Sequence, residues 1–93
     1  MALVGSGVVG PGLSQFFDVV LQSGVTYQVY VKPVDNSVDF DLYIYDERGN
    51  IVARDTTTAP DAYCNVTPLW TGPFRMEVKS ARGLSPFNIV VQA

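Results

Sequence analysis

Two aspartates near the middle of the sequence could supply ligands for a metal ion. Asp39 and Asp41 alternate along a predicted strand, so their side chains share one face and lie roughly 7 Å apart by strand rise. Calcium takes six to eight oxygen ligands, which carboxylates on a strand and nearby loop carbonyls can provide together. We therefore name Asp39 and Asp41 as candidate calcium ligands. The alternative is that both bond nearby backbone or remain solvated on the outer face.

Three tyrosines are the candidate ligand-binding residues. The alternation of apolar and polar positions places Tyr30, Tyr43 and Tyr45 on the outward face of the predicted strands. Aromatic rings provide a large contact area at a small entropy cost, so a group of them on a sheet can form a binding platform. The alternative is that these rings cover the sheet, or that the N-terminal segment covers them.

The residues needed for the common catalytic constellations are missing. The chain has no histidine, which excludes Ser-His-Asp and Cys-His catalysis and histidine metal ligation within it. Cys64 is the only cysteine, so neither an intramolecular disulfide nor a cysteine zinc site can form. We predict that the protein is not an enzyme, that it has no catalytic residues, and that it needs no cofactor, with calcium as a possible bound ion.

Size and charge restrict the possible classes further. Ninety-three residues allow one domain, and 47% hydrophobic with 16% charged residues exclude a disordered chain. The net charge of −3 argues against nucleic acid or an anionic membrane as partner. No apolar run reaches the ~18 residues of a membrane-spanning helix, and the first 13 residues lack the basic start of a signal peptide.

An alternation with a period of two runs through most of the chain, which is typical of strands with one buried face. The segments that show it are residues 14–21, 26–32, 38–45, 51–55, 63–68, 74–79 and 87–92. No segment has the spacing and cap of a helix. We predict an all-β fold, an antiparallel β-sandwich of about seven to eight strands over residues 13–93. The glycine-rich residues 1–12 are predicted to form a flexible arm.

Several segments resemble a known family. The run from Asp39 to Asp46 reads D-F-D-L-Y-I-Y-D and is followed by G-N-I-V-A from Gly49. This is similar to the D-x-D-L-Y-x-Y-D…G-x-x-V-A signature of the bacterial pre-peptidase C-terminal domain. Shorter similarities extend over residues 16–27, 70–78 and 87–91, so that the resemblance covers about residues 14–92. Phe74 departs from the pattern, because the family usually has tyrosine there.

The resemblance implies a jelly-roll-like sandwich that acts as an accessory module of secreted bacterial proteases and other exported proteins. The related clostridial collagen-binding domains bind calcium and collagen, and use tyrosines on a sheet face for binding. We therefore expect an extracellular module whose partner is a protein, a polysaccharide or a neighbouring catalytic domain. The alternatives are a purely structural spacer, a spacer that associates weakly with copies of itself through an edge strand, and a carbohydrate-binding sandwich.

Overall fold

Apolar side chains at every second position build strands throughout the part of the chain that the structure describes. The structure is a computed structural model and describes the backbone of residues 2–93 and the side chains of residues 5–93. The strands are β1 (Ala2–Val9), β2 (Ser14–Leu21), β3 (Tyr27–Pro33), β4 (Asp39–Tyr45), β5 (Ile51–Asp55), β6 (Ala62–Val66), β7 (Gly72–Arg82) and β8 (Ser85–Gln92). Within residues 2–93, no helix is long and apolar enough to cross a membrane.

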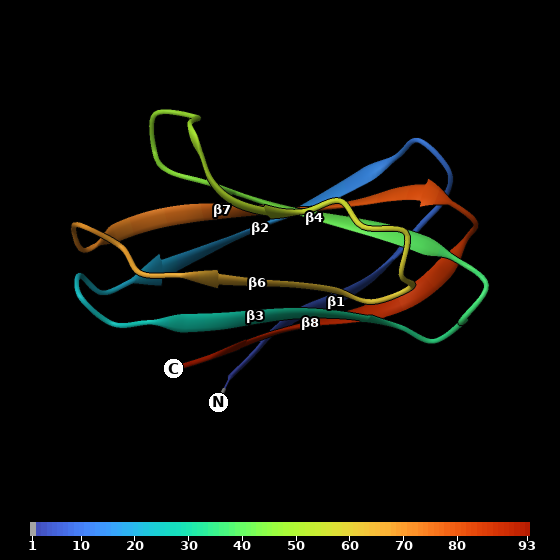
Figure 1. Ribbon diagram of the computed structural model, residues 1–93, viewed down its shortest axis with the longest axis horizontal. Helices are drawn as coiled ribbons and strands as arrows, with labels where there is room; N and C mark the ends of the chain where they lie inside the picture. The colour runs from blue at the N-terminus through green and yellow to red at the C-terminus, as the bar shows by residue number, and fades with distance from the viewer. Residues whose placement is uncertain (1) are drawn as a thin grey trace.

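The strands form two four-stranded antiparallel sheets that pack face to face. Sheet A has the order β1-β8-β3-β6, and sheet B has the order β2-β7-β4-β5. In Figure 1, β2, β4 and β7 lie in the upper layer, and β1, β3, β6 and β8 lie in the lower one. Only β4 and β5 are consecutive strands paired in the same sheet, and every other connection passes between the sheets. This order is that of a jelly roll, so the predicted all-β sandwich is confirmed.

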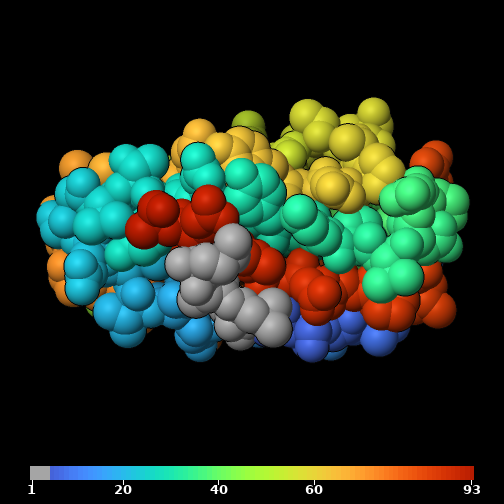
Figure 2. All heavy atoms as spheres, turned by 90° about the horizontal axis from the view of Figure 1, so that it is seen from below, coloured from blue at the N-terminus to red at the C-terminus, as the bar shows by residue number. Residues whose placement is uncertain are grey.

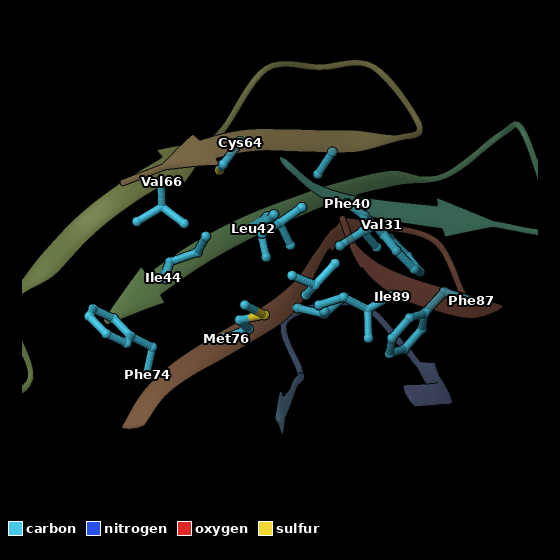
Figure 3. Packing of buried hydrophobic residues seen from close by; sticks show 14 of the residues in the cluster. Val31, Phe40, Leu42, Ile44, Cys64, Val66, Phe74, Met76, Phe87 and Ile89 are labelled. Atoms are coloured by element: carbon cyan, nitrogen blue, oxygen red, sulfur yellow. The ribbon is translucent and has the colours of Figure 1, made fainter. Parts of the chain in front are cut away.

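The core lies between the sheets, where the inward side chains of both meet (Figure 3). Val31 of β3, Leu42 of β4 and Ile89 of β8 are fully buried. The Phe40 and Phe87 rings meet edge to face, with centroids 5.8 Å apart. Inward residues alternate with more exposed ones along these strands, as the period of two predicts. The alternation therefore assigns one face of each strand to the core and the other to solvent.

The N-terminal segment differs from the prediction. Residues 2–9 form β1, an edge strand paired with β8, instead of part of a flexible arm. Gly5 lies against the Phe17 ring of β2, where a Cβ would require the ring to shift, and Gly7 lies against the end of the Gln15 side chain. Val9, at the end of β1, is buried in the core. The glycines therefore permit close packing of a strand here, rather than flexibility.

Candidate binding site

The outer face of sheet B carries two of the three predicted binding tyrosines. Tyr43 and Tyr45 lie two residues apart on β4, so both point away from the core, and both are half-buried. Their rings stack with centroids 6.3 Å apart and an interplanar angle of 23°. On β7, Glu77 is opposite Tyr43 and Arg75 is opposite Tyr45. The two rings therefore lie beside charged groups of the neighbouring strand.

Glu77 holds the Tyr45 ring in place through hydrogen bonds across three strands. The Tyr45 hydroxyl donates to Oε1 of Glu77 at 2.5 Å, and the Ser14 hydroxyl of β2 donates to Oε2 at 2.5 Å. The hydrogen bond to the Glu77 carboxylate, with lesser contributions from burial and from the Glu77 charge, raises the pKa of Tyr45 to about 12. Tyr45 is therefore neutral at physiological pH, and its hydroxyl is a hydrogen-bond donor with a defined direction.

A groove of about 550 Å³ opens beside Tyr45, where the strands of sheet B reach the β4–β5 turn. The residues that line it include Phe16, Asp18, Tyr45, Glu47, Pro73 and Arg75. Phe16 is 56% exposed, and the Arg75 guanidinium lies 5.8 Å from the centre of the Phe16 ring. Arg75 also pairs with Asp18 at 2.9 Å, and this hydrogen bond holds the pKa of Asp18 below its ordinary value.

Asp46 fixes the turn that forms one wall of this groove. Its Oδ1 accepts hydrogen bonds from the backbone N–H groups of Arg48 and Asn50, each at 2.9 Å. The hydrogen bond from the Asn50 backbone contributes most to keeping the pKa of Asp46 below its ordinary value. Gly49 has a φ of +84° at the turn, a conformation that glycine adopts without strain. The groove is therefore bounded by a hydrogen-bonded turn, which also contributes Glu47, while its aromatic residues and the Arg75–Asp18 pair come from β2, β4 and β7.

Tyr30, the third predicted tyrosine, lies on the opposite side of the molecule. It points outward from β3 in sheet A, whereas Tyr43 and Tyr45 point outward from sheet B. The three tyrosines therefore cannot form one contact face, and the expectation of a single face is wrong. Tyr30 is instead beside Tyr63 of β6, with ring centroids 4.8 Å apart. The parity of the alternation was sufficient to show that all three face outward, but not which sheet each belongs to.

The two candidate calcium ligands lie on the outward side of β4, toward the end of the strand away from Tyr45. Asp41 is only 9% exposed, and one carboxylate oxygen of each residue, Oδ1, is buried without a hydrogen-bond partner. Burial, followed by the charges of Asp39 and Asp55, raises the pKa of Asp41. Among the described side chains, no three Asp, Glu, Cys or His residues converge on one point. Two carboxylates fall short of the six to eight oxygens of a calcium ion, so they do not fit calcium by themselves.

The groove contains two residues, Phe16 and Arg75, that no sequence pattern marks as part of a site. Phe16 and Arg75 face outward by parity, but nothing in their spacing marks them as neighbours. The pairing of β2 with β7 brings them together, because Asp18 is opposite Arg75 and Phe16 is opposite Glu77. The one available signal was an aromatic residue, Phe16, at an outward position of a predicted strand. Such a ring is exposed unless another element covers it.

Comparisons with known proteins bear on the fold. No family model matches the sequence, and no curated protein matches it. Among solved structures, the chain is similar to the pre-peptidase C-terminal domain of a collagenase from Bacillus anthracis, with a TM-score of 0.74 and 12% sequence identity. The match covers 97% of this chain and 90% of that one. At this identity the likeness concerns the fold, and the fold is the one that the sequence resemblance implied.

Proposed function

We propose that this protein is a non-catalytic accessory module that binds a polypeptide in the groove beside Tyr45. The structural neighbour is a domain of a protease, which supports an accessory role beside a catalytic unit. By the same likeness to a domain of a collagenase, we infer that the module acts outside the cell. A shared fold does not determine which ligand is bound, so the class of ligand must be inferred from the residues of the groove.

The groove beside Tyr45 offers the mixture of groups that a polypeptide segment requires. Phe16 provides an exposed aromatic surface, and the Arg75–Asp18 pair provides both signs of charge at its edge. Aromatic residues and arginine are enriched at protein interfaces, particularly at the positions that contribute most to affinity. The single observation that carries the proposal is therefore the position of the exposed Phe16 ring beside Arg75 within this groove.

Calcium is not part of this proposal. The groove and the carboxylates of Asp39 and Asp41 lie toward different ends of β4, and the two carboxylates do not form a complete calcium site. Binding in the groove should therefore persist when calcium is removed. This expectation separates the proposed mode of binding from one that depends on the ion.

Retention on immobilised polypeptides tests the proposal. We would measure binding of the wild-type chain to fibrillar collagen, gelatin and casein, all in buffer with EDTA. The test variants are Phe16→Ala and Arg75→Ala, and the control is Val34→Ala, which truncates an exposed side chain in the β3–β4 connection. We expect retention on at least one polypeptide, a loss of about tenfold in affinity for Phe16→Ala, and no change for Val34→Ala.

Two results would overturn the proposal. The first is a wild-type chain that none of the three polypeptides retains, which would favour a structural spacer. The second is retention that Phe16→Ala and Arg75→Ala leave at the wild-type level, which would place any binding outside the groove. A melting curve for each variant establishes that the fold is intact, because both residues lie at the surface.

A further inference from the structure

The outer face of sheet A differs in chemistry from that of sheet B. The outward positions of its strands β3, β6 and β8 contain no Asp or Glu, and only one basic residue, Lys32. Four amide side chains and two tyrosines occupy most of these positions. They are Gln28, Tyr30, Tyr63, Asn65, Asn88 and Gln92, and we call this set the amide–tyrosine face. Figure 2 looks onto this side of the molecule, with β3 (teal) between β6 (yellow) and β8 (red).

Strand register arranges the centre of this face as two matched rows. Tyr30 is directly opposite Tyr63, and Gln28 is directly opposite Asn65. The Tyr63 hydroxyl donates to Oδ1 of Asn65 at 2.6 Å, and the Tyr30 hydroxyl donates to Oε1 of Gln28 at 3.3 Å. Each tyrosine hydroxyl therefore donates to the side-chain oxygen of the amide residue two positions away on its own strand. The N–H donors of both amides then point away from the tyrosine hydroxyls.

The remaining hydrogen-bonding capacity of the face is available to a ligand. Among the described side chains, the amide nitrogens of Gln28 and Asn65 have no partner, and neither do the amides of Asn88 and Gln92. Gln92 is opposite Gln28 across the β3–β8 pair, so the amides continue along one row from β6 to β8. An amide offers two donors and an acceptor in a fixed plane, which suits a ligand with many hydroxyl groups.

We propose that the amide–tyrosine face binds an uncharged polysaccharide. Sugar rings present hydroxyl groups to amides and C–H groups to aromatic rings, and Tyr63 is 38% exposed beside Tyr30. Because the outward positions of β3, β6 and β8 have no carboxylate, a neutral sugar chain that binds there would not strip water from a charged group on these strands without replacing it, except near Lys32. One Lys32 is too little positive charge to select an acidic polymer or nucleic acid. This face is separate from the groove on sheet B, so the inference goes beyond the proposed function.

The chemistry of this face favours a polysaccharide over a protein partner. Protein interfaces have an apolar centre in which a large side chain fills a pocket. Among the described side chains, the one aliphatic residue directly opposite either tyrosine in the strand register is Val90, which faces Tyr30 on β8. The Lys32 ammonium lies 5.5 Å from the centre of the Tyr30 ring, so a cation already occupies the surroundings of that ring. A face of amides and tyrosine hydroxyls therefore suits hydroxyl groups better than apolar anchors.

Affinity electrophoresis of the full chain tests this inference. Native gels would contain hydroxyethyl cellulose, soluble starch or galactomannan as uncharged polymers, and alginate as an acidic comparison. We expect at least one uncharged polymer to retard the wild-type chain. Tyr63→Ala and Asn65→Ala should each raise the apparent Kd about tenfold, because each removes a contact from the centre of the face. Phe16→Ala, on sheet B, should be retarded as strongly as the wild type.

The controls distinguish this inference from the proposed function. The test variant Asn65→Ala truncates an exposed amide, and the conservative variant Tyr63→Phe removes only the hydroxyl. Both should therefore leave the fold unchanged. No retardation by the three uncharged polymers would overturn the inference, and so would retardation by alginate alone. Retardation that persists in both Tyr63→Ala and Asn65→Ala would also overturn it. A loss of polypeptide retention in Tyr63→Ala would identify a protein-binding face instead.

Discussion

The ring of Phe17 in β2 lies directly against Gly5 in β1, and a Cβ at Gly5 would stand 2.5 Å from Cε2 of that ring. Phe17 in turn meets Phe87 of the core edge to face, with ring centroids 6.0 Å apart. Gly5 therefore adjoins a ring that packs on the core, at the place where β1 passes β2. The glycine is required by the close approach of the two strands, because its backbone needs no unusual φ.

Gly5→Ala should destabilise the protein for this reason. The added methyl group must displace the Phe17 ring, and overpacking of this kind typically costs about 1–3 kcal/mol. The matched control is Gly10→Ala, since a Cβ there would meet only Cδ1 of Leu84, at 3.4 Å. Urea unfolding of the three proteins would measure the difference. Equal midpoints for Gly5→Ala and the wild type would show that Phe17 moves aside without cost.

This glycine also explains why the sequence predicted seven strands and missed β1. Most of the seven predicted segments place Val, Ile, Leu or Phe at alternate positions, and each segment matches one of the strands β2–β8 within a few residues. In β1, glycine occupies positions 5 and 7, and glycine is depleted in strands because it loses more entropy on ordering. The reason for glycine at position 5 is the contact with the Phe17 ring, which belongs to the next strand along the chain. A local pattern cannot contain that information.

The candidate site was predictable only in part for a related reason. Parity shows correctly that Tyr30, Tyr43 and Tyr45 point outward, because the side-chain period of a strand is fixed. Whether a strand belongs to one sheet or the other depends on pairing between distant segments, such as β3 with β8 and β4 with β7. In a jelly roll, consecutive strands mostly alternate between sheets, so Tyr30 and Tyr43 separate. The same distant pairing creates the groove beside Tyr45.

Tyr45 should ionise only when the pH approaches 12. Its pKa of about 12 comes chiefly from the hydrogen bond to Glu77, and an absorbance titration at high pH would detect the late step. Tyr45→Phe should abolish that step. Since the folded pKa lies above the unfolded value of 10.0, the stabilising contribution is complete below pH 10.0 and is lost as the pH rises toward 12. At neutral pH we expect Tyr45→Phe to cost at most about 1 kcal/mol, because the bond lies at a half-exposed position.

Glu77→Gln provides the control for this assignment. The substitution removes the negative charge but leaves an amide oxygen that can accept the Tyr45 hydroxyl, so it should lower the pKa of Tyr45 toward 10.0. Ionisation of Tyr45 near pH 10.0 in the wild-type protein would contradict the hydrogen bond as the cause.

Cys64 should be unreactive until the protein unfolds. Its side chain is 5% exposed, and burial, with a smaller contribution from the Asp55 charge, raises the pKa of the thiol to about 12. Almost no thiolate is present at pH 8, and reagents cannot reach the sulfur in the folded state. Ellman's reagent should therefore modify Cys64 only at the rate at which the molecule opens, and urea should accelerate the reaction. Prompt modification of the native protein would show that the β3–β6 edge of sheet A opens locally.

Asp41→Asn should stabilise the protein at neutral pH by about 1 kcal/mol, or roughly 4–8 °C in Tm for a domain of this size. The pKa of Asp41 is raised in the folded state above 3.8, by burial and then by Asp39 and Asp55, so the native state holds this proton more tightly than the unfolded state does. Stability therefore falls as the pH rises from 3.8 through the folded pKa, and the substitution removes that loss. Below pH 3.8, where the carboxyl is protonated in both states, the two proteins should unfold alike. Asp61→Asn, at an exposed position, serves as the control and its Tm should change little.

Binding of calcium by Asp39 and Asp41 would give the opposite result. EDTA would then lower the wild-type Tm, and Asp41→Asn would be less stable than the wild type in the presence of calcium. Differential scanning calorimetry with and without EDTA therefore decides whether Asp41 is a metal ligand or a carboxylate buried without a partner.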